Sequence, residues 1–355
     1  MISHNRGEWS ELYGVLFLLV NPKLNIVNAK LETIDSALGL FILDEVISKS
    51  SVSLRYKIVN STILIFIDDY QYNTMSVEEI NEARQILIDN IKNATANNGA
   101  FEIPSLNQFL KEFSNNNEFK TGSREKGDIE LILFDSKREK DINLSYSIKS
   151  SLGSPATILN SSKNTDVMYR VHNFDISKIS EVNAINTRTK LLDRIRKIES
   201  LGGRIEYDSI PSPNFEYNLK MVDTDMPKYL GNTLLYSYKN NNKKLNDIFL
   251  QSNEFDDCNI AMKKLGDLIS AISFGFVPGT KWDGNKTVTG GLIIIKDSGQ
   301  VCLLDLIYFE NEVNKFLINE SKLDSPSSSR YHMLELFESR GNIYFTLNLQ
   351  IRYKE

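Results

Sequence analysis

Apolar residues recur at helical spacing near the start of the chain. In EWSELYGVLFLLV (8–20), Leu12, Val15 and Leu19 fall on one face, which predicts an amphipathic helix. Glu8 falls on the same face, where an ionised carboxylate is costly unless it meets a cation or hydrogen-bond donors. Glu8 is therefore either a candidate for chemistry or a first-turn acid that complements the positive end of the helix dipole.

Short β-prone runs follow this first helix. The runs at 23–32, 51–59 and 61–68 predict strands, whereas FILDEVISKS at 41–50 fits either a helix or the end of a strand. Ser76 then precedes a run with acids early and apolar residues at helical spacing, which predicts a capped helix directly after it.

The middle of the chain predicts a β-hairpin, with one strand near 128–134 and the other near 143–150, where apolar and polar residues alternate up to Lys149. Further elements are a strand at 167–173, helices at 176–183, 187–201 and 257–273, a hairpin at 292–307 and a strand within 341–355. Mixed strands and flanking helices indicate an α/β or mixed α+β fold.

The chain of 355 residues is long enough for one elaborated domain or for two. KNNNKKLND makes a polar break near residue 240, so the boundary that we predict separates 1–240 from 241–355, with a single domain as the alternative. The hydrophobic share of 41% and the charged share of 25% are typical of a soluble globular protein.

Cysteine and histidine are scarce. Cys258 and Cys302 cannot build a disulfide framework, and the three histidines show no zinc-ligand spacing. We therefore expect a reducing, cytoplasmic compartment. The apolar run LYGVLFLLV is shorter than the roughly 20 residues of a membrane span. Glu8 and Glu11 stand where a signal peptide would be cationic, so we expect neither kind of segment.

The net charge of −5 argues against a broad nucleic-acid-binding surface, since phosphate binding rests on clustered Lys and Arg. It does not exclude a local basic cleft, because the field of a charge is screened over short distances. An enzyme with an acidic metal site and a local basic cleft can be acidic overall.

The predicted hairpin carries the strongest candidate chemistry. Asp128 opens its first strand and Lys149 ends its second, so the two side chains can lie close together. Phosphodiester hydrolysis needs a carboxylate to hold a divalent cation and a cationic group that offsets developing negative charge. Mg²⁺ prefers oxygen ligands and keeps several waters, which suits a site with few carboxylates.

This pattern resembles the PD-(D/E)xK nuclease superfamily, with Asp128 in GDIELIL and Lys149 in SIK. Gly127 stands where a proline is common, and Ser147 occupies the position of the second acid. Ser147 cannot supply a charged ligand, so another carboxylate must do so, and Glu8 is our candidate. The lesser candidates are Glu130, Asp135 and Asp166.

Several longer stretches resemble the HpaII-like type II restriction endonucleases: NRGEWSELY, SYSIKSSLGSPATILNSSKNT, GGLIIIKDSGQVCLLDL, SPSSSRYH and LNLQIRY, in this order. The resemblance implies a restriction-endonuclease-like core, a central mixed β-sheet flanked by helices, with additional N-terminal β elements. Residues 1–240 would then be the catalytic region, and 241–355 a C-terminal α+β region with a possible role in DNA recognition.

The same resemblance implies a Mg²⁺-dependent nuclease that cuts double-stranded DNA at a short palindrome, CCGG in the family's namesake. It implies that Asp128 is a metal ligand, Lys149 the catalytic lysine and Glu8 the helix acid near the metal. Ser147 belongs to this catalytic set, and the backbone carbonyl of Ile148 would be a further metal ligand. A cognate DNA methyltransferase in the host is also expected.

Candidate DNA contacts lie after the catalytic strand and near the C-terminus. They are Ser150, Ser151, Thr157, Asn160, Lys281, Arg330, Gln350 and Arg352. Arg suits guanine edges and Gln suits adenine edges. The alternatives are a polar loop for the first four residues, surface ion pairs for the arginines, and a core role for Trp282 in the loop around Lys281.

Other polar residues have simpler interpretations. Asp256 and Asp257 are best explained as helix capping, and His172 and His332 as structural or exposed residues. Two other functions stay open, a structure-specific or repair nuclease and a DNA-binding protein that has lost activity. A palindrome cutter is expected to be a homodimer, because two-fold symmetric DNA matches a two-fold symmetric protein.

Overall fold

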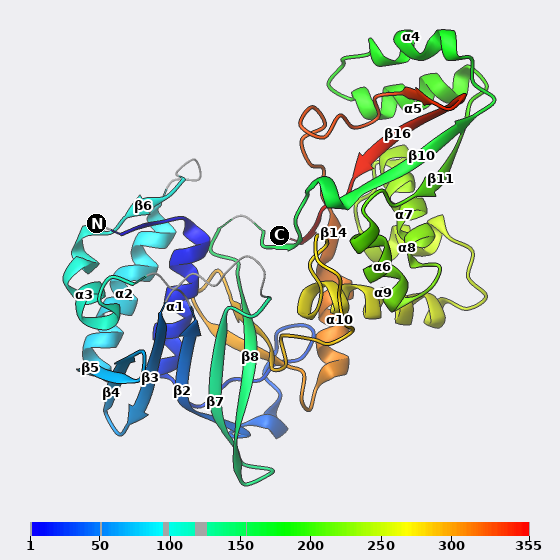
Figure 1. Ribbon diagram of the computed structural model, residues 1–355. Helices are drawn as coiled ribbons and strands as arrows, with labels where there is room; N and C mark the ends of the chain where they lie inside the picture. Colours follow the sequence, from blue (N-terminus) through cyan, green and yellow to red (C-terminus); the bar gives the residue numbers. More distant parts are fainter. Residues whose placement is uncertain (1, 50–51, 95–98, 118–125, 154, 355) are drawn as a thin grey trace. The chain divides into compact units, whose positions relative to one another are not determined.

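The computed structural model describes residues 2–49, 52–94, 99–117, 126–153 and 155–354 (Figure 1). The chain divides into two compact units. The first contains residues 1–156 and 286–316, and the second contains 157–285 and 317–354. Each unit is built from separated stretches of the chain. The predicted boundary near residue 240 falls inside the second unit, because that unit contains all of residues 157–285. There the polar run is a loop between two helices, and composition alone does not distinguish such a loop from a linker.

The helices are labelled in Figure 1. They are α1 (Arg6–Val20), α2 (Val77–Asn93), α3 (Asn107–Ser114), α4 (Ile179–Asn183), α5 (Lys190–Ser200), α6 (Pro213–Val222), α7 (Met226–Asn240), α8 (Leu245–Ser252), α9 (Cys258–Phe274) and α10 (Glu310–Glu320). Short 3-10 helices are η1 (Asp35–Ala37), η2 (Pro104–Leu106), η3 (Lys163–Thr165) and η4 (Ile176–Lys178). Within the described ranges, no helix is long and apolar enough to cross a membrane.

The strands of the first unit are β1 (Ser3–His4), β2 (Phe41–Lys49), β3 (Ser53–Val59), β4 (Thr62–Ile67), β5 (Tyr70–Ser76), β6 (Phe101–Glu102), β7 (Ile129–Asp135), β8 (Lys140–Ser150), β12 (Gly291–Ile295) and β13 (Val301–Asp305). Among the described residues, eight of them form one sheet in the order β13-β12-β8-β7-β2-β3-β4-β5. β12 runs parallel to β8, and the other neighbours are antiparallel. The large mixed sheet confirms the predicted fold class.

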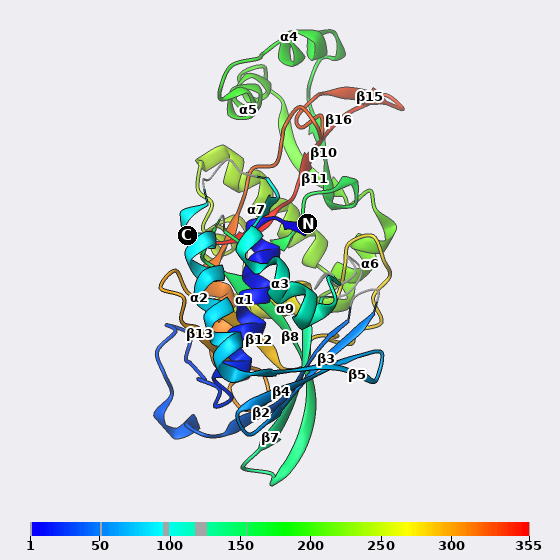
Figure 2. The same ribbon diagram turned by 90° about the vertical axis from the view of Figure 1, so that its left-hand side faces the viewer.

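Helices α1, α2 and α3 cover one face of this sheet. Figures 1 and 2 show α1 and α2 side by side, and both contribute to the apolar core of the unit. Gly14 lets α1 approach the sheet closely, because a Cβ there would lie 3.2 Å from the Ile295 side chain and 3.7 Å from that of Ile148. The first helix is thus packed directly on β8 and β12, next to the strand that ends in Lys149.

The second unit contains two smaller sheets and helices α4 to α9. Its strands are β9 (Thr157–Leu159), β10 (Asp166–His172), β11 (Arg204–Ser209), β14 (Ser321–Leu323), β15 (Phe337–Ser339), β16 (Asn342–Asn348) and β17 (Ile351–Tyr353). One sheet has the order β11-β10-β16-β15 and the other β14-β17-β9. Helix α7 packs against β11, and α9 packs against β9.

Several local predictions are confirmed and three change. The capped helix after Ser76 is α2, with both hydrogen bonds of a capping box. The run at 23–32 makes only isolated bridges, such as Ile26 with Leu303, so it is not a strand. The ambiguous run at 41–50 forms β2 over its described residues. The C-terminal run forms two strands, β16 and β17, instead of one.

We predict that Gly290→Ala destabilises the first unit. A Cβ at position 290 would overlap the ring of Tyr146, a fully buried residue of β8. We expect the free energy of unfolding to fall by about 2 kcal/mol, as in other overpacked cores. The measurement is urea denaturation, with Gly99→Ala as the control, because a Cβ at Gly99 would meet nothing within 4 Å. Equal stability of the two variants would contradict the packing described here.

Candidate functional site

Polar groups converge where the β7–β8 hairpin opens. Asp128 immediately precedes β7, and its Oδ2 accepts hydrogen bonds from Ser147 Oγ at 3.0 Å and from the amide of Ile148 at 2.6 Å. Lys149 Nζ lies 3.9 Å from the same oxygen, and both side chains are about a quarter exposed. The structure therefore brings Asp128 and Lys149 together, as their places in the predicted hairpin indicate, and places Ser147 beside them.

The register of the hairpin explains this convergence. The paired residues end with Ile129 opposite Tyr146, so Ile148 lies beyond the part of β8 that β7 pairs with. Its amide turns instead to the Asp128 carboxylate. Ser147 and Lys149 are two residues apart on β8 and share one face of the sheet, which is the face toward Asp128.

Gly127 permits the close approach of the chain to β8. A Cβ at this position would overlap the hydroxyl of Ser145, a residue of β8. The amide of Asp128 donates to Tyr146 O at 2.8 Å, which fixes the backbone there. Glycine in place of the usual proline therefore leaves room for the Ser145 hydroxyl.

Lys126 also belongs to this site and is not among the residues that the sequence predicts. Burial and, to a lesser extent, the nearby Lys149 lower the pKa of its amine, Asp128 partly offsets both effects, and the net result is a pKa of about 8. A signal was present in the sequence, because Lys126 precedes Asp128 by two residues and strand periodicity would give the two side chains one face. The site thus holds two lysines close to one carboxylate.

Glu8 occupies the third position of α1, where its carboxylate accepts the amide of Asn5 at 2.9 Å in a capping box. It also lies 3.6 Å from the ring of His4. The first turn of α1 is next to the segment that follows β8, since Arg6 packs against Gly153. Glu8 therefore serves as a first-turn acid, and its helix turn lies at the same end of the hairpin as Lys149.

The donor set fits a cation that takes few protein ligands. Within the described ranges, no cluster of three or more His, Cys, Asp or Glu side chains could hold a metal ion. Mg²⁺ is commonly bound by one or two carboxylates together with waters and substrate phosphates. Asp128, with a nearby carbonyl or acid, matches that requirement better than it matches a closed metal cage.

The lesser acidic candidates lie in different surroundings. Glu130 accepts a hydrogen bond from Asn143 at 3.4 Å on the face shared with Asp128. Asp135 is fully buried at the opposite end of β7, where it accepts the Tyr308 hydroxyl at 2.7 Å. Asp166 belongs to the second unit, and burial raises the pKa of its carboxyl although Asn348 hydrogen-bonds it. Only Glu130 among these three lies on the strand face of Asp128 within the described hairpin.

The candidate DNA contacts are distributed over both units. Ser150 ends β8 in the first unit and Ser151 follows it. Ser150 Oγ accepts the Leu152 amide at 3.1 Å, and the Ser151 amide donates to Ile295 O at 2.8 Å. The other six candidates lie in the second unit. These are Thr157, Asn160, Lys281, Arg330, Gln350 and Arg352.

Two of these six are held in the interior or in an ion pair. Gln350 is buried, and Arg352 makes an ion pair with Asp324 at 2.8 Å. Asn160, Lys281 and Arg330 are exposed. Arg352 is therefore a surface ion-pair residue, as the alternative interpretation states. The side chains of Asn160, Lys281 and Arg330 are accessible to a ligand.

The simpler interpretations of the remaining polar residues agree with the structure. Asp257 caps α9 by accepting the amide of Asn259. His172 pairs with Glu206 at 3.0 Å, and His332 pairs with Glu335 at 3.0 Å.

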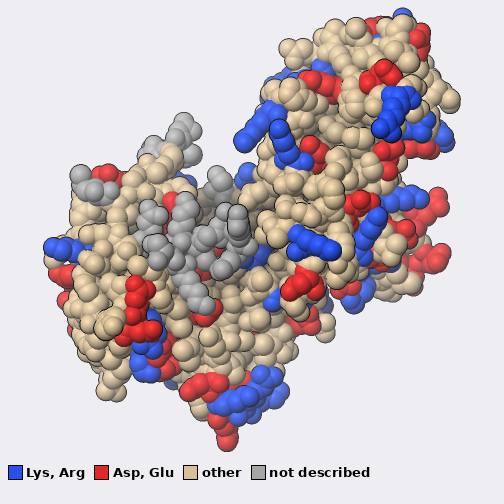
Figure 3. Space-filling model, viewed as in Figure 1, with Lys and Arg blue, Asp and Glu red and all other residues tan. Residues whose placement is uncertain are grey.

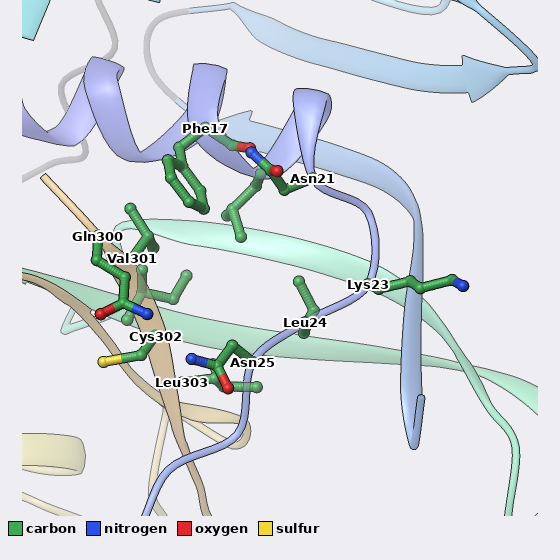
Figure 4. A pocket seen from close by; sticks show the side chains of 11 residues that line it. Phe17, Asn21, Lys23, Leu24, Asn25, Gln300, Val301, Cys302 and Leu303 are labelled. Atoms are coloured by element: carbon green, nitrogen blue, oxygen red, sulfur yellow. The ribbon is translucent and has the colours of Figure 1, made fainter. Parts of the chain in front are cut away.

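A cavity of about 160 Å³ lies elsewhere in the first unit (Figure 4). Its walls come from the end of α1, the segment after it and β13, and the described residues that line it include no predicted site residue. Cys302 lines this cavity, and burial raises the pKa of its thiol to about 11. The thiol is therefore protonated at neutral pH and is a poor nucleophile.

Comparisons with known proteins cover the whole chain. A family model described as HpaII restriction endonuclease matches residues 5–353. The type II restriction enzyme HpaII of Haemophilus parainfluenzae is 29% identical over 360 residues, which cover 99% of this chain and 98% of that enzyme. No solved structure matches the chain. Both similarities extend across the two units.

We predict that Lys126 titrates near pH 8 and responds to its neighbours in opposite directions. In Lys149→Met the pKa of Lys126 should rise, because a like charge is removed, and in Asp128→Asn it should fall, because the compensating charge is removed. The measurement is NMR of lysine side chains in EDTA, with Lys140→Met as the control on the exposed far end of β8. An unperturbed lysine titration near pH 10.4 would contradict this geometry.

Proposed function

The chain belongs to the HpaII restriction endonuclease family, a family of site-specific DNA endonucleases, and from this premise we propose a specific activity. It is a type II restriction endonuclease that hydrolyses double-stranded DNA at the palindrome CCGG and requires Mg²⁺. The observation that carries the proposal is the placement of Lys149 3.9 Å from the Asp128 carboxylate, at the open end of the hairpin.

Asp128, Glu8 and the backbone carbonyl of Ile148 would hold the cation. When bound, Mg²⁺ supplies Lewis-acid stabilisation of charge on the scissile phosphate. Ser147 cannot be a charged ligand, and it acts instead on Asp128, whose carboxylate it orients through a hydrogen bond of 3.0 Å. The amide of Ile148 fixes the same oxygen at 2.6 Å, so the carboxylate is positioned before any substrate arrives.

Lys149 supplies the cationic group of the reaction. Its ammonium orients the attacking water and offsets the negative charge that develops on the phosphate. Lys126 adds a second amine close to the first, which strengthens the local positive field in an otherwise acidic protein. Hydrolysis leaves a 3′ hydroxyl and a 5′ phosphate.

A palindromic target implies symmetric binding. We propose that the protein acts as a homodimer, so that two identical sites cut the two strands of a two-fold symmetric duplex. A cognate methyltransferase in the same host would protect the host's own CCGG sites. It is a functional partner and need not bind this protein.

We predict that Lys149→Ala lowers the rate of plasmid cleavage at least about 100-fold, because it removes charge stabilisation in the transition state. The assay follows supercoiled plasmid with many CCGG sites in Mg²⁺ and in EDTA, and the ends of the products are sequenced. Lys140→Ala is the matched control, since Lys140 is an exposed lysine on the same strand.

Wild-type and Lys140→Ala protein should cut in Mg²⁺ alone, with ends at CCGG. Cleavage that persists in EDTA or in Lys149→Ala would contradict the proposed centre. Product ends at another palindrome would replace CCGG as the recognised sequence and leave the proposed chemistry unchanged. A preference for branched or damaged DNA would indicate a repair nuclease. DNA binding without any cleavage would identify an inactive relative.

We predict that Glu8→Gln separates the capping role of Glu8 from its proposed role at the metal. Gln also satisfies a capping box, so the free energy of unfolding should change by less than about 0.5 kcal/mol. The charge is lost, and the Mg²⁺ concentration for half-maximal cleavage should rise about tenfold or more. The measurement is a Mg²⁺ titration of the cleavage rate. An unchanged titration would remove Glu8 from the metal site.

A further inference from the structure

Three loops of the second unit lie next to one another although they are far apart in the sequence. The Tyr331 hydroxyl donates to Ser161 O at 3.1 Å, across a separation of 170 residues. Asn164, in the same loop as Ser161, is 2.9 Å from where a Cβ on Gly279 would lie. We call this surface, made of residues 160–165, 276–282 and 327–334, the three-loop surface. It contains Asn160, Lys281 and Arg330.

The loop at 276–282 is fixed by the side chains of α6. Asn218 is fully buried and donates to Val277 O at 3.3 Å and to Thr280 O at 2.8 Å, while its own oxygen accepts the Trp282 amide at 2.8 Å. The nitrogen and the oxygen of the Asn218 side chain thus both bond to the backbone of this loop and hold it in place. Lys281 remains exposed at its tip, with its ammonium 4.4 Å from the centre of the Tyr217 ring.

The loop at 327–334 has a buried end and an exposed tip. Met333 and Leu334 are buried, and the Leu334 amide donates to Thr346 O at 2.9 Å, whereas Arg330 is exposed. The φ angles of His332 and Leu334 are +47° and +58°, a left-handed conformation that costs free energy in residues with a side chain. Such strain persists where the surrounding structure holds it, and it is frequent at binding sites.

A buried arginine holds the far end of this loop. Arg194 is only 4% exposed, and its guanidinium donates to Leu334 O at 3.1 Å, Asn183 O at 2.7 Å and Ile185 O at 3.1 Å. The backbone carbonyls compensate a charge that would otherwise be costly to bury. The protein therefore uses a buried cation to set the position of a loop whose tip is an exposed arginine.

The exposed side chains of this surface have the chemistry of a DNA-binding site. Lys163, Lys281 and Arg330 are exposed. Of the neighbouring acids, Glu335 pairs with His332, and Asp166 accepts from Asn348 and also interacts with Lys163. Burial raises the pKa of the Asp166 carboxyl, and Lys163 lowers it in part. Figure 3 shows Lys and Arg interspersed with Asp and Glu over the visible face, without separation into large areas of one sign. On a surface of mixed charge, DNA binding would rest on a few well-placed cations.

We propose that the three-loop surface binds duplex DNA, with Arg330 reading a guanine edge and Lys163 and Lys281 contacting phosphates. The inference rests on the proposed function and deepens it by naming the residues that recognise the substrate. Arg330 suits a guanine because its planar guanidinium donates two parallel hydrogen bonds to O6 and N7, and the fixed loop presents it without a large ordering cost. Lysine is a point charge and suits phosphates.

The test is fluorescence anisotropy with the full-length protein in EDTA, where cleavage is blocked. The probes are a duplex with one CCGG site and the same duplex with GGCC at that place, each titrated between about 50 and 200 mM salt, where phosphate contacts are salt-sensitive. Lys163→Ala and Lys281→Ala should weaken binding to both probes and reduce the slope of log affinity against log salt by about 1 each.

Arg330→Ala should reduce the ratio of affinities for the two probes on the order of 10- to 100-fold. Arg330→Lys should keep the slope of log affinity against log salt and still lose the preference for CCGG over GGCC. The variant retains the positive charge but lacks the paired donors of a guanidinium. The controls are Arg340→Ala and Lys228→Ala, exposed cations of the same unit outside the three-loop surface, and both should match wild type.

The outcomes separate the two proposals. If wild type discriminates between the probes and the Arg330 and lysine variants behave like the controls, the three-loop surface is wrong and the endonuclease proposal stands. If wild type neither binds the probes in EDTA nor cuts the CCGG probe in Mg²⁺, the proposed CCGG activity itself fails. Circular dichroism of each variant identifies any loss of binding that comes from unfolding, and a variant that unfolds is replaced by Arg330→Gln or Lys281→Gln.

Discussion

The candidate centre depends on the hydrogen bonds that the Asp128 carboxylate accepts. One comes from the Ile148 amide at 2.6 Å, at the point where pairing between β7 and β8 has ended. The carboxylate thus accepts a hydrogen bond from a backbone amide of β8 that has no partner among the described residues of β7. The same oxygen accepts a hydrogen bond from the Ser147 hydroxyl. Because β8 alternates its side chains, this contact also brings Lys149 to the same place. The Asp128 carboxylate therefore both holds the end of β8 in place and is a proposed metal ligand.

Local pattern was sufficient for the elements that carry this centre. The hairpin, the first helix and the capped helix after Ser76 follow from periodicity and capping signals. β2 was ambiguous because a bulge between Leu43 and Glu45 interrupts its alternation. The division into two discontinuous units was not predicted, since it depends on contacts between distant stretches that no local pattern encodes.

The residues of the site show the same limit. Asp128 and Lys149 were predicted from their places in the hairpin and Ser147 from the superfamily resemblance. Lys126 was missed, because its spacing of two residues from Asp128 is its one signal and many charged residues precede a strand in this way. Gln350 and Arg352 have base-reading chemistry in the sequence, yet one is buried and the other pairs with Asp324. Residue type indicates what a side chain can do, and only the fold determines whether it is available to do it.

Whether Asp128 holds the catalytic metal can be tested directly by locating a divalent cation in the structure. Crystals of the Lys149→Ala protein with a CCGG duplex, soaked in Mn²⁺, would be measured by anomalous diffraction. If Asp128 is a metal ligand, we expect a Mn²⁺ peak in direct contact with its carboxylate and with a phosphate oxygen. A Mn²⁺ peak bound to other side chains, with Asp128 free of metal, would contradict this role.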